Sequence, residues 1–137
     1  MKAYLHTKLR RLRGKSRLDL LYQDKWWADQ HGRICLTRHL TDEHRANLVR
    51  WLWLNARRLQ SARELEELLR ARRGDWDDFM DPEFDMDPQK WMSQLPLFLA
   101  LVDQLPFNSR GHRAHLIAGR RYKNCFACQA PYSDFPE

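Results

Sequence analysis

The fold is decided between Thr41 and Gln60, where the sequence reads TDEHRANLVRWLWLNARRLQ. Thr41 is a favourable N-cap residue, and the two acidic residues that follow it suit the positive end of a helix dipole. Apolar residues recur on one face at helical spacing, and bulkier ones widen the apolar surface almost all round. The members of that face are Leu48, Leu52, Ala56 and Leu59. We predict that this helix forms the centre of the core.

Further helices are expected on both sides of this segment. Leucines four and three residues apart predict a helix in residues 4–13. Ser61 and Glu64 form a capping-box pattern, which predicts that a separate helix begins at Ser61 and ends at Gly74. The alternative is one long helix that bends at this point. An acidic cap at Asp87, followed by proline, favours another helix, which Pro96 should kink or restart.

A short β-hairpin is predicted in residues 25–36. Two bulky runs flank a turn-like stretch that ends in Gly32. Four residues would supply the cross-strand pairs, namely Trp26, Trp27, Ile34 and Leu36. The whole pattern therefore predicts a mainly α fold, a compact bundle of four to five helices with a small N-terminal β-hairpin.

The 137 residues are enough for one modest core, so we expect a single domain over 1–137. It divides into a basic N-terminal helix (1–24), the hairpin with the central helix (25–60), helices with an acidic loop (61–106, loop 75–87) and a basic tail (107–137). No run approaches the roughly 20 apolar residues of a membrane span, and no stretch resembles a signal peptide. Three cysteines are too few for a disulfide scaffold, so we expect a cytoplasmic protein without a membrane partner.

The charge is unevenly distributed. The net charge is +6, from 24 basic and 18 acidic residues. Residues 2–17 contain seven Lys or Arg and no acid, and residues 110–123 are basic again. Such clusters neutralise phosphates and release counterions, which favours DNA or RNA as a partner. The candidate contacts are Arg10, Arg11, Arg13, Lys15, Arg17, Arg120, Arg121 and Lys123. The alternative is an ordinary solvated face or pairing with acids of the same molecule.

Residues 75–87 carry seven acids and no base, interleaved with aromatic residues. Acidic-hydrophobic segments serve as binding peptides, and spaced carboxylates can imitate a phosphate backbone. The candidate partner-binding residues are Asp75, Trp76, Asp77, Asp78, Phe79, Asp81, Glu83, Phe84 and Asp85. The alternative is an acidic loop pinned to the domain by its aromatics. The spacing does not match a calcium-binding loop.

One constellation has metal-ligand spacing. His112-x2-His115 precedes Cys125-x2-Cys128, and two imidazoles with two thiolates complete a tetrahedral zinc shell. We therefore predict one structural zinc that ties the basic tail. The alternatives are histidines that face solvent or phosphate, and a redox pair of cysteines, which the absence of an α/β pattern disfavours.

A second metal set is weaker, and the chain offers no catalytic motif. His31, Cys35, His39 and His44 would converge only if the hairpin folds back on the helix start, and a buried structural cysteine is the simpler interpretation. No glycine-rich phosphate loop is present, and paired carboxylates occur only in the acidic segment. We expect a protein that is not an enzyme.

Trp27, Gly32 and the following hairpin residues precede a helix with His44-x2-Asn47, and a Leu-Pro helix follows at residues 95–102. This arrangement resembles small uncharacterised phage and prophage accessory proteins. The resemblance implies a phage or prophage origin and a small helical protein, and it implies no activity. His44 and Asn47 either form a small polar site or fasten the hairpin to the helix by hydrogen bonds.

These observations lead to three hypotheses about function. The first is a non-enzymatic phage-type effector that binds and inhibits a host nucleic-acid machine, such as a polymerase, nuclease or defence complex. The second is a direct nucleic-acid-binding protein that uses its basic N-terminus and tail. The third is a structural or assembly component of a virion.

Overall fold

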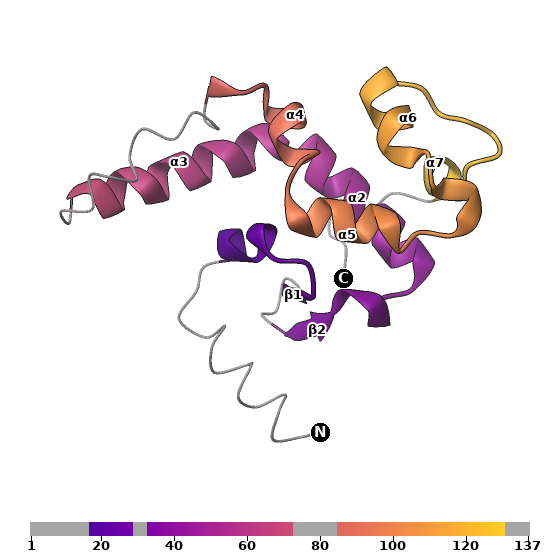
Figure 1. Ribbon diagram of the computed structural model, residues 1–137, viewed down its shortest axis with the longest axis horizontal. Helices are drawn as coiled ribbons and strands as arrows, with labels where there is room; N and C mark the ends of the chain where they lie inside the picture. Colours follow the sequence, from indigo (N-terminus) through magenta and orange to yellow (C-terminus); the bar gives the residue numbers. More distant parts are fainter. Residues whose placement is uncertain (1–16, 29–32, 73–84, 131–137) are drawn as a thin grey trace.

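Helices dominate the computed structural model, which describes residues 17–28, 33–72 and 85–130 (Figure 1). Together with a two-stranded antiparallel hairpin, they confirm the predicted mainly helical class. The strands are β1 (Trp26–Ala28) and β2 (Ile34–Leu36), and short 3-10 helices are η1 (Arg17–Tyr22), η2 (Thr37–His39) and η5 (Phe107–Ser109). The α-helices of the described residues are α2 (Asp42–Leu54), α3 (Ala56–Arg72), α4 (Pro88–Met92), α5 (Pro96–Asp103), α6 (His112–Ala118) and α7 (Phe126–Gln129).

The central helix begins where the sequence predicts and ends earlier than expected. Thr41 accepts a hydrogen bond from the His44 amide at 3.1 Å, which caps α2. The helix then ends at Asn55, whose backbone amide and side-chain amide both donate to the Trp51 carbonyl. The predicted helix start at Ser61 is wrong, because Ser61 is an exposed residue inside α3. The Asn55 side chain thus adds a second bond to a carbonyl of the preceding turn, and local side-chain bonds of this kind compete with a regular helix.

The hairpin register places both tryptophans of β1 in buried positions. Trp26 pairs with Leu36, and Trp27 pairs with Cys35. Gln23 fixes the entry to β1, because its Oε1 accepts from the Lys25 and Trp26 amides while its Nε2 donates to the Leu20 and Trp26 carbonyls. The hairpin prediction is therefore confirmed.

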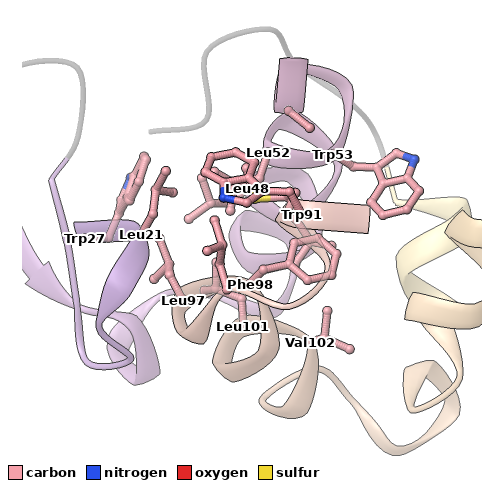
Figure 2. Packing of buried hydrophobic residues seen from close by; sticks show 14 residues of the cluster. Leu21, Trp27, Leu48, Leu52, Trp53, Trp91, Leu97, Phe98, Leu101 and Val102 are labelled. Carbon is pink, nitrogen blue, oxygen red and sulfur yellow. The ribbon is translucent and has the colours of Figure 1, made fainter. Parts of the chain in front are cut away.

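The main core lies where α2, α4 and α5 meet η1 and the hairpin (Figure 2). The two short helices α4 and α5 begin as predicted, since Asp87 caps α4 by accepting from the Lys90 amide, and Pro96 starts α5. The largest side chains with almost no exposure are Trp91, Phe98, Leu21, Leu48, Leu52, Met92, Leu97 and Leu101. Dense apolar burial of this kind is the main driving force for folding.

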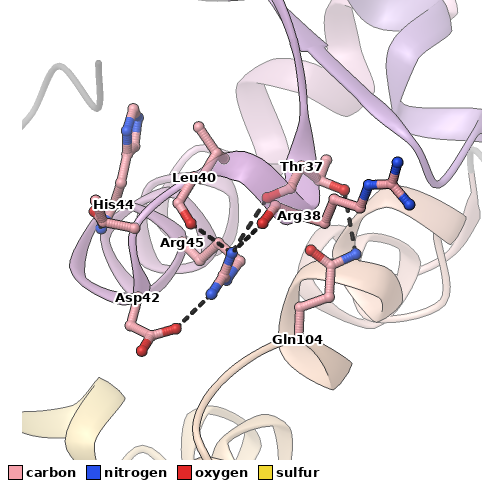
Figure 3. A network of polar contacts seen from close by, with 8 residues as sticks. Thr37, Arg38, Leu40, Asp42, His44, Arg45 and Gln104 are labelled. Atoms are coloured by element: carbon pink, nitrogen blue, oxygen red, sulfur yellow. Dashed lines mark hydrogen bonds and ion pairs between the residues drawn. The ribbon is translucent and has the colours of Figure 1, made fainter.

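A buried arginine joins the hairpin to the core helices (Figure 3). Arg45 Nη1 donates to the Leu40 carbonyl at 2.6 Å and lies 3.3 and 3.4 Å from the carbonyls of Arg38 and Thr37. Its Nη2 pairs with Asp42, and Gln104 of α5 donates to Thr37 Oγ1 at 3.2 Å. The sequence analysis gave a fastening role to His44 and Asn47 and missed the arginine between them.

Figure 1 shows α3 extending from one side of the main core, while α6 and α7 lie at the opposite side, beyond the end of α5. Arg63 ties α3 to η1 through an ion pair with Asp19 at 2.8 Å. Within the described residues, no helix combines the length and the hydropathy that crossing a bilayer requires.

Two leucines of α5 should differ sharply in how much they contribute to the free energy of unfolding. Leu101 is fully buried and Leu99 is 42 % exposed. Leu101→Ala should lower the free energy of unfolding by about 2–5 kcal/mol, because it removes buried surface and leaves a cavity. Leu99→Ala should cost less than about 1 kcal/mol. Urea denaturation of both variants measures the difference, and equal losses would contradict the placement of α5.

Candidate metal centre

The first two candidate ligands lie on α6. His112 and His115 are three residues apart, so one helical face carries both rings, which contact edge to face at 6.2 Å between centroids. The helix then ends at Gly119, which adopts φ +69°, a left-handed conformation that only glycine takes readily. This sharp end turns the chain back toward α7.

The two cysteines lie at the start of the short helix α7 and within it. Cys125 is its N-cap residue, and Cys128 lies three positions later, so both sulfurs point to the same side of one helical turn. Both cysteines are buried. His112 is also buried, with 1 % of its surface exposed, which rules out the alternative that it faces solvent.

The four predicted residues come together in space. Cys128 Sγ lies 3.4 Å from His112 Nδ1 and 3.4 Å from His115 Nδ1, and Cys125 Sγ lies 3.6 Å from His112 Nδ1. One donor atom from each residue lies within 4.8 Å of every other. His112 Nε2 is buried without a hydrogen-bond partner among the described residues. The nitrogen of His112 that faces the two sulfurs is thus Nδ1, as the distances to both cysteines show.

These distances fit a tetrahedral metal site. Zn–S bonds of about 2.3 Å and Zn–N bonds of about 2.0 Å in a tetrahedron place neighbouring donor atoms roughly 3.3–3.8 Å apart. The three sulfur–nitrogen distances fall in this range, and for the remaining pairs of donor atoms the limit is the wider 4.8 Å. Two thiolates and two neutral imidazoles form a donor set that zinc prefers. With four protein ligands no position is left open for water, which is the pattern of structural rather than catalytic sites.

Without a bound cation, burial favours the neutral forms of the His112 imidazole and the Cys128 thiol. Burial lowers the pKa of His112 to about 4, and electrostatic interactions with Arg50 and the neighbouring His115 act in the same direction. Its imidazole is therefore neutral at pH 7, with a lone pair available for a metal. Burial raises the pKa of the Cys128 thiol, and the neighbouring Cys125 sulfur acts in the same direction, although a backbone hydrogen bond with Tyr122 opposes them. Without a cation this sulfur keeps its proton.

A fully buried serine supports the first cysteine. Ser109 Oγ accepts a hydrogen bond from the Ala127 amide at 2.9 Å and lies 3.5 Å from Cys125 Sγ, whose thiol donates to it. Once Cys125 is a thiolate, the serine hydroxyl is free to reverse this bond and donate to the sulfur. This role was not predicted from the sequence, because nothing local links Ser109 to Cys125, 16 positions later.

Two arginines donate hydrogen bonds to backbone carbonyls of α7 and of the residue that follows it. Arg50 of α2 donates to the carbonyls of Ala127 at 2.9 Å, Cys128 at 3.0 Å and Ala130 at 3.3 Å. Arg121 donates to the Cys128 carbonyl at 3.1 Å. These bonds satisfy the carbonyls at the end of α7 and attach it to the central helix. The ring of His115 is likewise held, since it stacks on Tyr122 at 4.0 Å.

The apolar support of this region is small. A second cluster, separate from the main core, contains the two cysteines with Ala46, Leu105, Ala127 and Ala130. Its buried members are mostly small and the Phe126 ring packed against it is half-buried, so hydrophobic burial stabilises this region less than the main core. Small units of this kind usually depend on a metal or a disulfide.

The other predicted site residues lie partly within and partly outside the described residues. Arg120, Arg121 and Lys123 are exposed, and Arg17 begins η1. The predicted helix at 4–13 and the candidate contacts Arg10, Arg11, Arg13 and Lys15 lie outside the described residues, as do positions 75–84 of the acidic segment. Asp85 is described and exposed.

The second predicted metal set is not brought together. Cys35, His39 and His44 form no ligand cluster within the described ranges, which do not include His31. Cys35 instead donates to the Trp27 carbonyl across the hairpin at 3.7 Å. This cysteine has the structural role that the sequence favoured.

Comparisons with family models, with curated proteins and with solved structures find no match to this chain. Its function is therefore argued from the metal centre and the surface around it.

The centre predicts that each chain binds one zinc ion. Cobalt(II) should give the intense visible absorption of tetrahedral sulfur coordination, and zinc should displace it. Cys128→Ser should abolish this absorption, whereas Cys35→Ser, which alters a cysteine outside the cluster, should leave it unchanged. Metal analysis and cobalt titration measure both effects. Equal binding by the two variants would contradict the assignment.

The hydrogen bond between Ser109 and Cys125 leads to a second prediction, which concerns the affinity of the site for its metal. Removing a hydrogen-bond partner of a metal ligand typically weakens metal affinity by about 10–100-fold. Ser109→Ala should do so, while Ser93→Ala, which removes another buried hydroxyl that contacts the Lys90 carbonyl, should not. Competition with a chelator gives the affinities. If both variants lose affinity equally, the loss reflects general destabilisation rather than support of Cys125.

Proposed function

We propose that this protein binds nucleic acid through the C-terminal unit, defined as residues 104–130, which one structural zinc holds together. The single observation that carries the proposal is its charge. The unit contains five Lys or Arg residues and no acidic residue. All five are exposed, namely Arg110, Arg113, Arg120, Arg121 and Lys123. A rigid cationic surface without carboxylates attracts phosphates and releases their counterions.

The contacts of these cations support the proposal. Among the described residues, none of the five forms an ion pair with a carboxylate. Arg113 and Arg121 each donate one bond to a backbone carbonyl, of Ser93 and Cys128 respectively, which fixes their stems. The guanidinium of Arg110 lies over the Phe107 ring at 4.8 Å. Positioned but unpaired guanidinium groups are well suited to phosphate oxygens.

A binding role agrees with a closed metal site. Four protein ligands fill the coordination shell, so the metal would order the surface without activating a water molecule. The proposal therefore assigns no catalytic step to this protein. The hypotheses of an effector against a host nucleic-acid machine and of a virion component draw on the uneven charge, including the acidic segment, and the first also on the phage-like resemblance. Residues 75–84 of that segment lie outside the described residues, and both hypotheses stay predictions.

The proposal predicts a position-dependent effect of charge. Arg110→Gln with Arg120→Gln removes two cations from the C-terminal unit, and Arg57→Gln with Arg58→Gln removes two exposed cations from α3. The first pair should weaken binding to a fluorescent oligonucleotide severalfold and reduce the slope of log K against log salt by about 0.7–0.9 per lost contact. The second pair should change neither quantity appreciably.

Fluorescence anisotropy with the zinc-loaded protein, repeated at several salt concentrations, measures both quantities. No binding at low salt would refute the proposal. Equal loss in the two double variants would also contradict it, because binding would then follow net charge rather than this surface.

A further inference from the structure

An open pocket lies beside the metal centre, between η5 and residues 123–130, and has a volume of about 450 Å³. It adjoins the buried side of Cys125, but its lining is different in character from the metal ligands. The lining consists of three carboxamides, one lysine and one aromatic ring, together with Cys125 and Ala130. The carboxamides, the lysine and the ring belong to Asn108, Lys123, Asn124, Phe126 and Gln129.

The chemistry of this lining is that of a base-binding site. Each carboxamide offers both hydrogen-bond donors and an acceptor, which is what the edge of a nucleobase requires. The half-buried Phe126 ring provides a flat apolar face for stacking, and Lys123 supplies a cation for an adjoining phosphate. No acidic side chain lines the pocket. Gln129 is partly fixed, because its Nε2 donates to the Tyr122 carbonyl at 3.2 Å.

We propose that this pocket binds an unpaired nucleobase, so that the nucleic acid recognised by the C-terminal unit is single-stranded. This inference rests on the proposed function and makes it more specific. In a duplex the bases are paired and stacked, so their faces cannot reach Phe126. In a single strand a base can leave the stack and lie against an aromatic ring while its edge meets amide groups. The exposed arginines of the same unit then bind the neighbouring phosphates.

A free phosphate or another small anion fits the pocket less well. One lysine is its only cationic side chain, and three neutral amides with an aromatic ring do not concentrate positive charge. The amides are instead matched to a ligand with both donors and acceptors on one planar edge. The volume is within the usual range of roughly 300–1,000 Å³ for small-ligand sites, which leaves room for a base and its sugar.

The test compares ligands that carry the same number of phosphates. Fluorescence anisotropy of the zinc-loaded full chain is measured with a single strand that bears bases, with an abasic strand of equal length, and with a duplex. Deoxyribose and ribose versions of the first strand distinguish DNA from RNA. The base-bearing strand should bind at least about fivefold more tightly than the abasic strand, since one stacked base contributes that much or more.

Two phenylalanine variants locate the effect. Phe126→Leu keeps an apolar side chain but removes the flat ring, and it should reduce the preference for the base-bearing strand to less than about twofold. Phe107→Leu changes a ring that is 80 % exposed and outside the pocket, and it should keep the preference. Asn108→Ala, at an exposed lining residue, should weaken the preference without affecting the fold. Zinc content is measured for each variant to verify that the centre is intact.

The outcomes separate this inference from the proposed function. Equal affinity for the base-bearing and abasic strands, still weakened by the Arg110 and Arg120 double variant, would overturn the pocket and leave nucleic-acid binding standing. A preference lost in Phe107→Leu but kept in Phe126→Leu would also overturn it, because the base would then stack outside the pocket. If neither strand binds, the proposed function fails and the inference fails with it.

Discussion

The side chains of His112, His115, Cys125 and Cys128 lie close together, and burial opposes charge on two of them, His112 and Cys128. They lie within 4.8 Å of one another, and burial both lowers the pKa of His112 and raises the pKa of Cys128. A divalent cation removes this conflict, since it stabilises the thiolates and uses the neutral imidazoles as ligands. A bound cation would add to the stability of the surrounding residues, whose own apolar cluster is small.

The molecule is therefore stabilised in two different ways. Around α2, α4 and α5, large apolar side chains fill a common core. In the C-terminal unit, the ligand cluster and polar contacts replace most of that burial. Arg50 connects the two parts, because it projects from the central helix to three carbonyls at the cysteine helix. A basic surface built on such a unit is held rigidly only while the cluster is intact, which couples the proposed binding role to the metal.

Sequence reasoning succeeded where the signal is local. The Thr41 cap, the hairpin around Trp27 and the spacing of the four ligands each involve residues close in the chain, and the structure agrees with all three. It failed where two local signals compete. Ser61 has a good capping pattern, but the helix break occurs at Asn55. Arg45, Arg50 and Ser109 were missed because their partners are carbonyls, amides and a sulfur, which carry no sequence signature at a distance. The base pocket is formed by η5 and residues 123–130, and no motif marks it.

Zinc K-edge X-ray absorption of the purified, zinc-loaded protein tests the central claim most directly. The spectrum reports the number and type of atoms bound to the metal. The account predicts two sulfur ligands at about 2.3 Å and two nitrogen ligands at about 2.0–2.1 Å, with one zinc per chain. A shell of oxygen and nitrogen alone, or a protein that retains no zinc after dialysis, would contradict it.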